Sequence, residues 1–348
     1  MPGKRPPREK DFTRRFLTGE HDADDLTPVE RLDGKLKTLR QRKLLETAEL
    51  RSEDSDLETL PVGRVRQVFS LYTEVDLQGR PVLCTVRRTL TRLRREAAIV
   101  GDLVRVRLLP RRDDESPQEG VIEAVEPRTT LLTRADSFKA RESHPIVANA
   151  TQMLIVVAVD QPAPRWGLVD RMLVAAFAGG LKPVICLNKI DLGEANPQAL
   201  ADARDVLAHY RKLGFTAHET CATRPGSEEL LRDTLRGHIT VLAGHSGVGK
   251  SSLVRCIRPD LDIRVGEISH VHLKGKHTTT SARLYDLPEL HAHLIDTPGV
   301  KLFGLWNVTP ELLEQLFPDV ADGTAPPWRH DSHTRLLASL ESPPAPPR

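Results

Sequence analysis

The chain has 348 residues, of which 39% are hydrophobic and 28% charged, as in ordinary soluble proteins of two or three domains. It has no apolar run of 18 residues and no apolar N-terminal segment, so membrane insertion and export are not supported and a cytoplasmic location is expected. The net charge of +2 does not indicate nucleic-acid binding, and four cysteines without CxxC spacing favour reduced thiols over disulfides.

Residues 1–60 are predicted to form a mobile basic arm, a short helix and a linker. Six of the first fifteen residues are Lys or Arg, and a partner-binding arm and a merely solvated tail are both open interpretations. In Thr27-Pro28-Val29-Glu30 an N-cap, a first-turn proline and a capping-box glutamate coincide, which predicts an amphipathic helix near residues 28–47.

Residues 61–128 consist of short β-rich runs separated by turn-like segments, which predicts a small all-β module. About five strands in this length fit an OB-type barrel, a fold whose open face commonly binds RNA or DNA. The region contains thirteen arginines and no lysine, with a cluster from Arg87 to Arg95, and arginine donates to phosphates in pairs. Aromatic residues for base stacking are few, so we expect backbone contacts; a solvated charged face is the alternative.

Residues 129–304 alternate apolar runs of strand length with segments of helical spacing. The strand-like runs are residues 153–159, 183–188, 238–244 and 292–297, and the helix-like segments are 167–179, 197–213 and 250–257. This alternation predicts a doubly wound α/β domain with a mainly parallel sheet and a nucleotide at the carboxyl ends of its strands. Residues 305–348 are expected to form a small helical element and a proline-rich tail.

The segment GHSGVGKSS matches G-x-x-x-x-G-K-[ST] between a predicted strand and a predicted helix, the context of a phosphate-binding loop. Its N–H groups can cradle phosphate oxygens, Lys250 can reach the β- and γ-phosphates, and Ser251 can bind Mg²⁺. The expected phosphate-binding residues are Gly244, His245, Ser246, Gly247, Val248, Gly249, Lys250, Ser251 and Ser252.

Two further segments complete the predicted phosphate and metal site. In DTPG, Asp296 follows an apolar run and can hold a Mg²⁺-bound water, while the Gly299 N–H can meet the γ-phosphate. GKHTTT, residues 275–280, offers the hydroxyls of a switch loop that completes Mg²⁺ coordination. Spacing does not decide between Thr278 and Thr279 as the ligand, and Thr279 is preferred.

The tetrad Asn188-Lys189-Ile190-Asp191 predicts guanine recognition. The Asp191 carboxylate can accept from both N1–H and the 2-amino group of guanine, a donor pair that adenine lacks, so GTP is favoured over ATP. Lys189 can lie along the base, and Asn188 can tie this loop to the phosphate loop. HETCATRPG, residues 218–226, is the expected second base loop, acting through the backbone near Cys221 and Ala222.

The base-reading tetrad precedes the phosphate loop in this chain, which reverses the usual order. The site of a parallel sheet is formed by loops that converge in space, so a circular permutation between the two halves leaves the loop positions intact. We therefore predict a circularly permuted α/β P-loop GTPase domain in which the strand ending in DTPG leads into the C-terminal element.

This motif order, preceded by a barrel, resembles the circularly permuted GTPases of the RsgA (YjeQ) type, which depend on the small ribosomal subunit. Stretches such as VANATQMLIVVAV and FGLWNVTPELLEQLFPDV extend the resemblance over residues 60–320. The resemblance implies a role in maturation of the small (30S) subunit, rRNA binding through the barrel, and GTP hydrolysis stimulated by the subunit. We expect a monomer.

The C-terminal region departs from this family, whose members usually bind a zinc ion there through three cysteines and a histidine. No cysteine follows Cys256, and His330, Asp331 and His333 make too poor a set for a structural zinc site. No zinc is therefore expected, and these three residues are interpreted as solvated tail residues. Either the element is partly disordered or it is held by packing of Leu312, Leu313, Leu316 and Phe317.

The residue that positions the attacking water is not defined by the motifs. Val300 follows DTPG where many GTPases place a glutamine, and valine cannot orient water by hydrogen bonding. One hypothesis is that His277 of the switch loop, or a group from the ribosome, takes this role; the other is that His277 is a surface histidine. The alternative to a GTPase is a GTP-dependent RNA-binding switch with negligible intrinsic catalysis.

Overall fold

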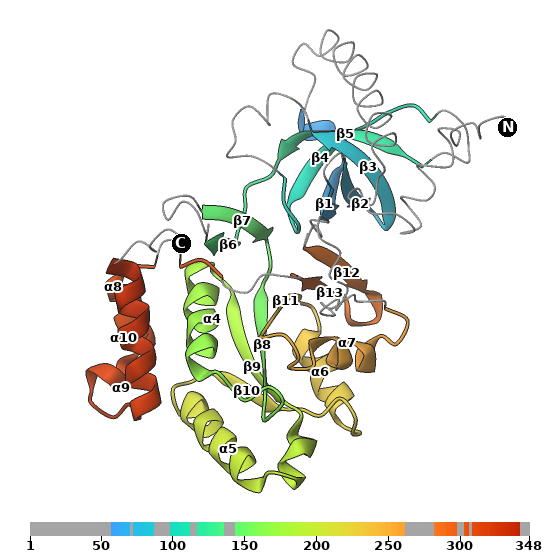
Figure 1. The fold of residues 1–348 in the computed structure, drawn as a ribbon. Helices are drawn as coiled ribbons and strands as arrows, with labels where there is room; N and C mark the ends of the chain where they lie inside the picture. Colours follow the sequence, from blue (N-terminus) through green and yellow to red (C-terminus); the bar gives the residue numbers. More distant parts are fainter. Residues whose placement is uncertain are drawn as a thin grey trace, which may run out of the picture. The chain divides into compact units, whose positions relative to one another are not determined.

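The computed structural model describes residues 57–69, 72–86, 98–111, 117–135, 143–261, 282–297, 303–305 and 308–341. The chain divides into two compact units, Met1–Pro127 with Val271–Ser281 and Arg128–His270 with Ala282–Arg348 (Figure 1). The predicted helix near 28–47 and the predicted switch loop 275–280 lie outside the described residues. None of the described helices is long and apolar enough to cross a membrane.

In the described part of the first unit, five strands form a barrel. They are β1 (Val62–Val68), β2 (Thr73–Leu77), β3 (Arg80–Val86), β4 (Leu103–Leu108) and β5 (Glu119–Val125), and the short 3-10 turn η2 (Leu57–Thr59) precedes them. Their order is β1-β2-β3-β5-β4, and pairing of β1 with β4 closes the barrel. Alternate side chains, mostly valines, fill its interior. The predicted OB-type barrel is confirmed.

In the described part of the second unit, six strands form a sheet in the order β10-β9-β8-β11-β13-β12. They are β8 (Gln152–Ala158), β9 (Lys182–Asn188), β10 (Thr216–Glu219), β11 (Ile239–Ala243), β12 (Arg283–Leu287) and β13 (Ala292–Asp296). Neighbouring strands are parallel except β12 and β13. The predicted mainly parallel sheet is therefore confirmed, and each of the four predicted strands ends within one residue of its observed limits; β10 and β12 were not predicted.

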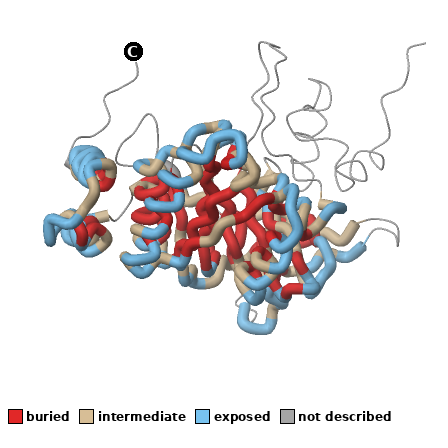
Figure 2. Tube along the Cα trace, turned by 90° about the horizontal axis from the view of Figure 1, so that it is seen from below, coloured by how far each residue is buried: buried red, intermediate tan, exposed pale blue. Residues whose placement is uncertain are grey.

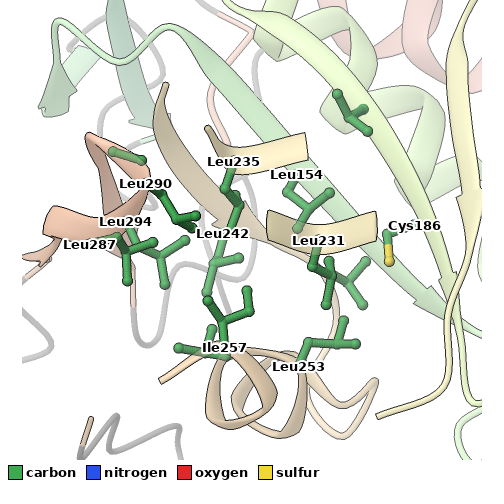
Figure 3. Close-up of a cluster of buried hydrophobic side chains, with 14 of the residues drawn as sticks. Leu154, Cys186, Leu231, Leu235, Leu242, Leu253, Ile257, Leu287, Leu290 and Leu294 are labelled. Atoms are coloured by element: carbon green, nitrogen blue, oxygen red, sulfur yellow. The ribbon is translucent and has the colours of Figure 1, made fainter. Parts of the chain in front are cut away.

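Helices cover both faces of this sheet (Figure 1). On one face lie α4 (Trp166–Ala178) and α5 (Pro197–Lys212), and on the other lie α6 (Ser227–Leu235) and α7 (Lys250–Ile257). The limits of α4, α5 and α7 were predicted to within one residue, whereas α6 was not predicted. Figure 3 shows the apolar core beneath α6 and α7, where leucines of the two helices meet Leu242 of β11 and Leu294 of β13.

The second unit also contains a hairpin and two 3-10 turns. The hairpin is formed by β6 (Leu131–Ala135) and β7 (Ser143–Ala148), and the turns are η3 (Ile190–Glu194) and η4 (Pro288–Leu290). Figure 2 shows that the buried positions follow the strands of the sheet and the inner sides of its helices. Because both faces of the sheet are covered, the strands read as continuous apolar runs in the sequence.

Three helices follow at the C-terminal end: α8 (Pro310–Leu316), α9 (Pro318–Ala321) and α10 (Pro327–Glu341). Leu313 and Phe317 are buried in one cluster with Val174 of α4 and Leu336 of α10, and Leu316 is partly buried there, which confirms packing in this element. Leu312, which was predicted to pack with them, is not part of this cluster. The interpretation of residues 330–333 as a tail is wrong. His330 and Asp331 are exposed but helical, and the rings of His333 and Phe317 lie 5.1 Å apart.

Candidate nucleotide-binding site

The predicted phosphate loop, residues 244–249, connects β11 directly to the first turn of α7. Gly244, Gly247 and Gly249 have φ angles of 142°, 83° and 93°, a region that other residues rarely adopt. A Cβ atom at Gly244 would lie 2.3 Å from the carbonyl oxygen of Val156, and one at Gly249 would lie 2.4 Å from Asn188 Nδ2. The glycines therefore permit a tight curvature and a close approach that no side chain would allow, as a phosphate-binding loop requires.

Lys250 is held against this loop. Its Nζ donates to the carbonyl oxygens of Gly244 and His245, each over 2.9 Å. Burial lowers the pKa of Lys250, and the nearby Asp296 carboxylate opposes that shift. Burial also raises the pKa of Asp296, at the end of β13, and Lys250 opposes that shift in turn. Both charged groups are therefore only partly compensated, and an anion at Lys250 and a cation at Asp296 would each be stabilised.

Asn188 joins the base-reading tetrad to the phosphate loop. It is the last residue of β9 and is 1% exposed. Its Nδ2 donates to the carbonyl oxygen of Val248 over 2.9 Å, and its Oδ1 accepts from Thr220 Oγ1 over 3.2 Å. Asn188 and Val248 are 60 residues apart in the sequence, so the fold brings together the two loops that were predicted to share one nucleotide.

Thr220 was missed by the sequence analysis and belongs to this same network. It follows β10 and is fully buried. Its Oγ1 also lies 3.0 Å from Cys186 Sγ, and its N–H donates to the carbonyl oxygen of Leu187 over 2.8 Å. It therefore fixes the amide of Asn188 with the oxygen towards Thr220 and the nitrogen towards the phosphate loop. A threonine after a strand is commonplace, so HETCAT contains no signal that marks this hydroxyl as buried.

Lys189 and Asp191 lie on the turn after β9. Lys189 has a φ angle of 60°, its Nζ donates to the carbonyl oxygen of Gln161 over 2.5 Å, and its Cε would lie 3.7 Å from a Cβ atom at Gly249. Its aliphatic stem therefore runs beside the phosphate loop. The Oδ2 atom of Asp191 accepts a long hydrogen bond, 3.4 Å, from Thr223 Oγ1, so the tetrad is adjacent to the second base loop.

Of the two predicted backbone contacts in the second base loop, the one at Ala222 is more available to a base than the one at Cys221. The Cys221 N–H donates to Ser227 Oγ over 2.7 Å and is thus engaged within the protein. The Ala222 carbonyl oxygen lies 3.1 Å from Cys256 Sγ of α7, while the Ala222 N–H has no hydrogen bond to the described residues. Ala222 is therefore the better candidate for a backbone donor to the base.

A small apolar cavity beside the phosphate loop was also missed. The end of β8, residues 162–165 and α4 line one side, and residues Gly244, His245 and Val248 line the other. A Cβ atom at Gly247 would lie 3.5 Å from Pro162 Cδ, so the 162–165 loop comes close to the phosphate loop. The lining is mostly aliphatic and suits an apolar side chain better than a phosphate.

The remaining predicted residues divide into two sets. Ser251 and Ser252 continue the first turn of α7, Ser246 is exposed on the loop, and the Ile190 N–H donates to the Thr220 carbonyl oxygen over 3.4 Å. The predicted roles of the other set stay predictions, because those residues lie outside the described part of the chain: His277, Thr279 and Gly299.

Comparison with known proteins agrees with this geometry. Residues 125–306 match the family described as RsgA GTPase. A protein from Pseudomonas syringae pv. syringae (strain B728a), named small ribosomal subunit biogenesis GTPase RsgA, is 38% identical over 310 residues, which are 87% of this chain and 85% of that protein. The chain belongs to the RsgA GTPase family. The prediction of a GTPase of this family is thereby confirmed.

A further relative and two solved structures extend the comparison. A Vibrio vulnificus (strain YJ016) protein, named small ribosomal subunit biogenesis GTPase RsgA 1, is 41% identical over 236 residues; the match spans 67% of this chain and 63% of that protein, less than two thirds of its length. The crystal structure of YjeQ from Thermotoga maritima has a TM-score of 0.61 at 27% identity and covers 81% of this chain and 99% of its own. YloQ, described as a circularly permuted GTPase, has a TM-score of 0.58 at 22% identity and covers 83% of this chain and 98% of its own, which shows that the two share a fold.

Proposed function

We propose that this RsgA-family GTPase binds GTP and Mg²⁺ between its phosphate loop and its base-reading tetrad and acts in maturation of the small ribosomal subunit. The observation that carries the nucleotide site is the hydrogen bond from Asn188 Nδ2 to the Val248 carbonyl oxygen, which fixes the two loops together beside Lys250. The proposed role rests on the relatives from Pseudomonas and Vibrio, which are named as small ribosomal subunit biogenesis GTPases.

Guanine specificity is assigned to Asp191, with the Ala222 N–H as a second contact. The substitution Asp191→Asn replaces one acceptor oxygen by a donor, which would oppose a donor of guanine. Loss of the negative charge and of one of the two hydrogen bonds corresponds to roughly a 100-fold lower GTP affinity. Xanthosine triphosphate carries a carbonyl where guanine has its 2-amino group, so the variant is expected to prefer it. Titration with both nucleotides tests this assignment, and unchanged GTP affinity would contradict it.

The proposed magnesium ligands are Ser251, Asp296 and Thr279. The part of this set that the structure describes fits a hard cation, since Asp296 is a buried carboxylate whose pKa is raised by burial and only partly restored by Lys250. A bound Mg²⁺ would neutralise charge on the β- and γ-phosphate oxygens. No zinc is proposed for this chain. Among the described residues, no three His, Cys, Asp or Glu side chains are grouped so that they could hold a metal.

Hydrolysis is assigned to positioning and charge neutralisation by the phosphate loop. Lys250 already lies against the loop carbonyls, so it is placed to hold the phosphates without a large rearrangement. The water is proposed to be positioned by His277 or by a group from the ribosome. Full subunit-stimulated turnover of the His277→Ala variant would assign the role to the ribosome.

The barrel is proposed to contact rRNA, and its ion pairs narrow the contacting side chains. Arg66 lies 3.8 Å from Asp76, Arg107 donates to Glu123 over 2.7 Å, and Arg105 pairs with Glu126. These guanidinium groups are neutralised within the barrel and have less to offer a phosphate. We therefore assign the contact to exposed Arg80 and to the Arg87–Arg95 cluster, which lies outside the described residues.

The decisive experiment combines GTP turnover with co-sedimentation, using isolated small and large ribosomal subunits. The chain is proposed to act as a cytoplasmic monomer that binds small subunits in its GTP form and hydrolyses GTP faster in their presence. Binding to neither subunit would remove the ribosomal assignment and leave the nucleotide site intact. Subunit binding without any stimulated turnover would favour the alternative, a GTP-dependent RNA-binding switch.

A further inference from the structure

A charged side chain is buried where the C-terminal helices meet α4. Arg329 of α10 is 1% exposed, and the carboxylates on either side, Asp170 of α4 and Asp319 of α9, are equally inaccessible. Arg329 Nη1 donates to Asp170 Oδ1, Nε donates to Asp319 Oδ2 over 3.3 Å, and Nη2 donates to the Leu316 carbonyl oxygen over 2.7 Å. One guanidinium thus connects α4, α9 and α10 with the end of α8.

Aromatic rings enclose this Arg329 cluster. The guanidinium carbon lies 3.8 Å from the centre of the Phe317 ring and 5.6 Å from that of Tyr210. The Tyr210 hydroxyl donates to Asp170 Oδ1 over 2.8 Å, and His209 Nε2 lies 2.8 Å from Asp319 Oδ2. Helix α5 therefore contributes two polar groups to the same cluster, so four helices and the end of α8 meet at a single buried cation.

The C-terminal helices need such an attachment because they have little core of their own. Helix α8 has 7 residues and α9 has 4, lengths at which an isolated helix is unstable in water. The fully buried part of their apolar contact with α4 is small and consists of Val174, Leu313, Phe317 and Leu336, against which partly buried aliphatic side chains pack. Elements of this size are commonly fixed by a metal ion or a disulfide, and no cysteine follows Cys256 in this chain.

We propose that the Arg329 cluster is a metal-free anchor that fixes the C-terminal helices on α4. If one partner of a buried ion pair is removed, the other charge stays buried without compensation, which is strongly destabilising. Removal of Arg329 would leave the carboxylates of Asp170 and Asp319 buried without the cation that both of them contact. The free energy needed to keep them charged, or to protonate them, would weaken the attachment of α9 and α10 to α4.

The test compares Arg329→Met with Arg335→Met in the full chain by hydrogen exchange. Both substitutions remove a guanidinium from α10, but Arg335 is exposed. In Arg329→Met, amides of residues 310–341 are expected to exchange at least tenfold faster, while those of residues 239–257 in the phosphate-loop region keep wild-type rates. In Arg335→Met, both regions are expected to stay at wild-type rates. Wild-type protein in EDTA is expected to show no acceleration.

Two outcomes would overturn the proposal: wild-type protection of residues 310–341 in Arg329→Met, or faster exchange of wild-type protein in EDTA. Should Arg329→Met fail to fold, Asp319→Asn supplies a milder test, because it keeps the Arg329–Asp170 pair and removes one charged acceptor. A severalfold acceleration confined to residues 310–341 is then expected, and no acceleration would contradict the anchor. None of these readouts depends on nucleotide or ribosome binding, so the result is independent of the proposed function.

Discussion

The nucleotide site and the Arg329 cluster both contain buried charges in the second unit, and they differ in how these charges are compensated. At the nucleotide site, the donors of Lys250 reach two backbone carbonyls, and Lys250 is the one side chain that opposes the burial-induced rise in the pKa of Asp296 among the described residues. At the Arg329 cluster, burial also raises the pKa of Asp170, but Arg329 and Tyr210, which both donate to Asp170 Oδ1, oppose the rise. A buried charge with few partners in the protein points to a ligand site, and a buried charge paired with opposite charges of the protein points to a structural anchor.

The largest effect on activity is expected for Lys250→Ala. Without the ammonium group, the charge on the transferring phosphate loses its side-chain partner, and loss of such a contact costs roughly 100- to 1,000-fold in turnover. Lys182→Ala is the matched control, because Lys182 is exposed at the start of β9. Single-turnover hydrolysis of GTP measures both variants. Turnover of Lys250→Ala within threefold of wild type would show that the protein itself compensates the charge of Lys250, so that this lysine does not act on a phosphate.

Asp296→Asn tests whether the Asp296 carboxylate destabilises the nucleotide-free protein. Its folded-state pKa lies above the unfolded value, so the folded chain binds the proton more tightly and loses stability as the pH rises from the unfolded pKa through the folded pKa. The amide removes this loss, and the nucleotide-free variant is expected to melt above wild type at neutral pH, with the difference vanishing below the unfolded pKa. Thermal melts across this pH range measure it.

Addition of GTP and Mg²⁺ should reverse the order, since the variant lacks a proposed metal ligand. The two ligands are then expected to raise the melting temperature of the wild-type protein more than that of Asp296→Asn. A nucleotide-free wild type that melts above the variant at neutral pH would contradict the first part. Equal stabilisation of both proteins by Mg²⁺ with GTP would remove Asp296 from the metal site.

Local determinants explain which parts of the fold and site were predictable. Residues 244–252 and 188–191 each form a short segment whose residue types follow from loop geometry or from hydrogen bonding to a base. Strands β8 and β11 are covered on both faces and therefore appear as apolar runs. Strands β10 and β12 were missed because they are short, contain polar residues and lie at the ends of the second unit's sheet order.

Contacts between distant segments were not predictable from the sequence. Arg329 and Asp170 are separated by 159 residues, and Arg329 stands next to exposed His330 in the chain. Helical periodicity identifies apolar faces, so a buried charge within a polar stretch is invisible to it. Thr220 was missed for a similar reason, because its role depends on the position of Asn188 in another strand.

Thr220→Val is expected to have an intermediate effect. The substitution keeps the shape of the side chain but leaves Asn188 Oδ1 without its donor, at a cost of about 1–2 kcal/mol, or roughly 5- to 30-fold in GTP affinity if the amide turns away from the phosphate loop. Thr234→Val is the control, because Thr234 Oγ1 donates to the Leu230 carbonyl oxygen within α6. Calorimetric titration with GTP measures both, and equal affinities of the two variants would show that Thr220 does not orient Asn188.

The smallest effect on stability is expected for an exposed ion pair, because solvent also stabilises its charges. Arg204 of α5 lies 2.8 Å from Glu219 of β10, and the two side chains are 51% and 25% exposed, so the pair contributes about 0–1 kcal/mol. Arg204→Met should lower the free energy of unfolding by less than about 1 kcal/mol, whereas the same change at buried Arg329 should cost about 3–5 kcal/mol. Urea denaturation measures both. If both variants lost the same free energy of unfolding, the buried Arg329 cluster would stabilise the protein no more than the exposed Arg204–Glu219 pair does. The distinction between an anchor and a surface ion pair would then be wrong.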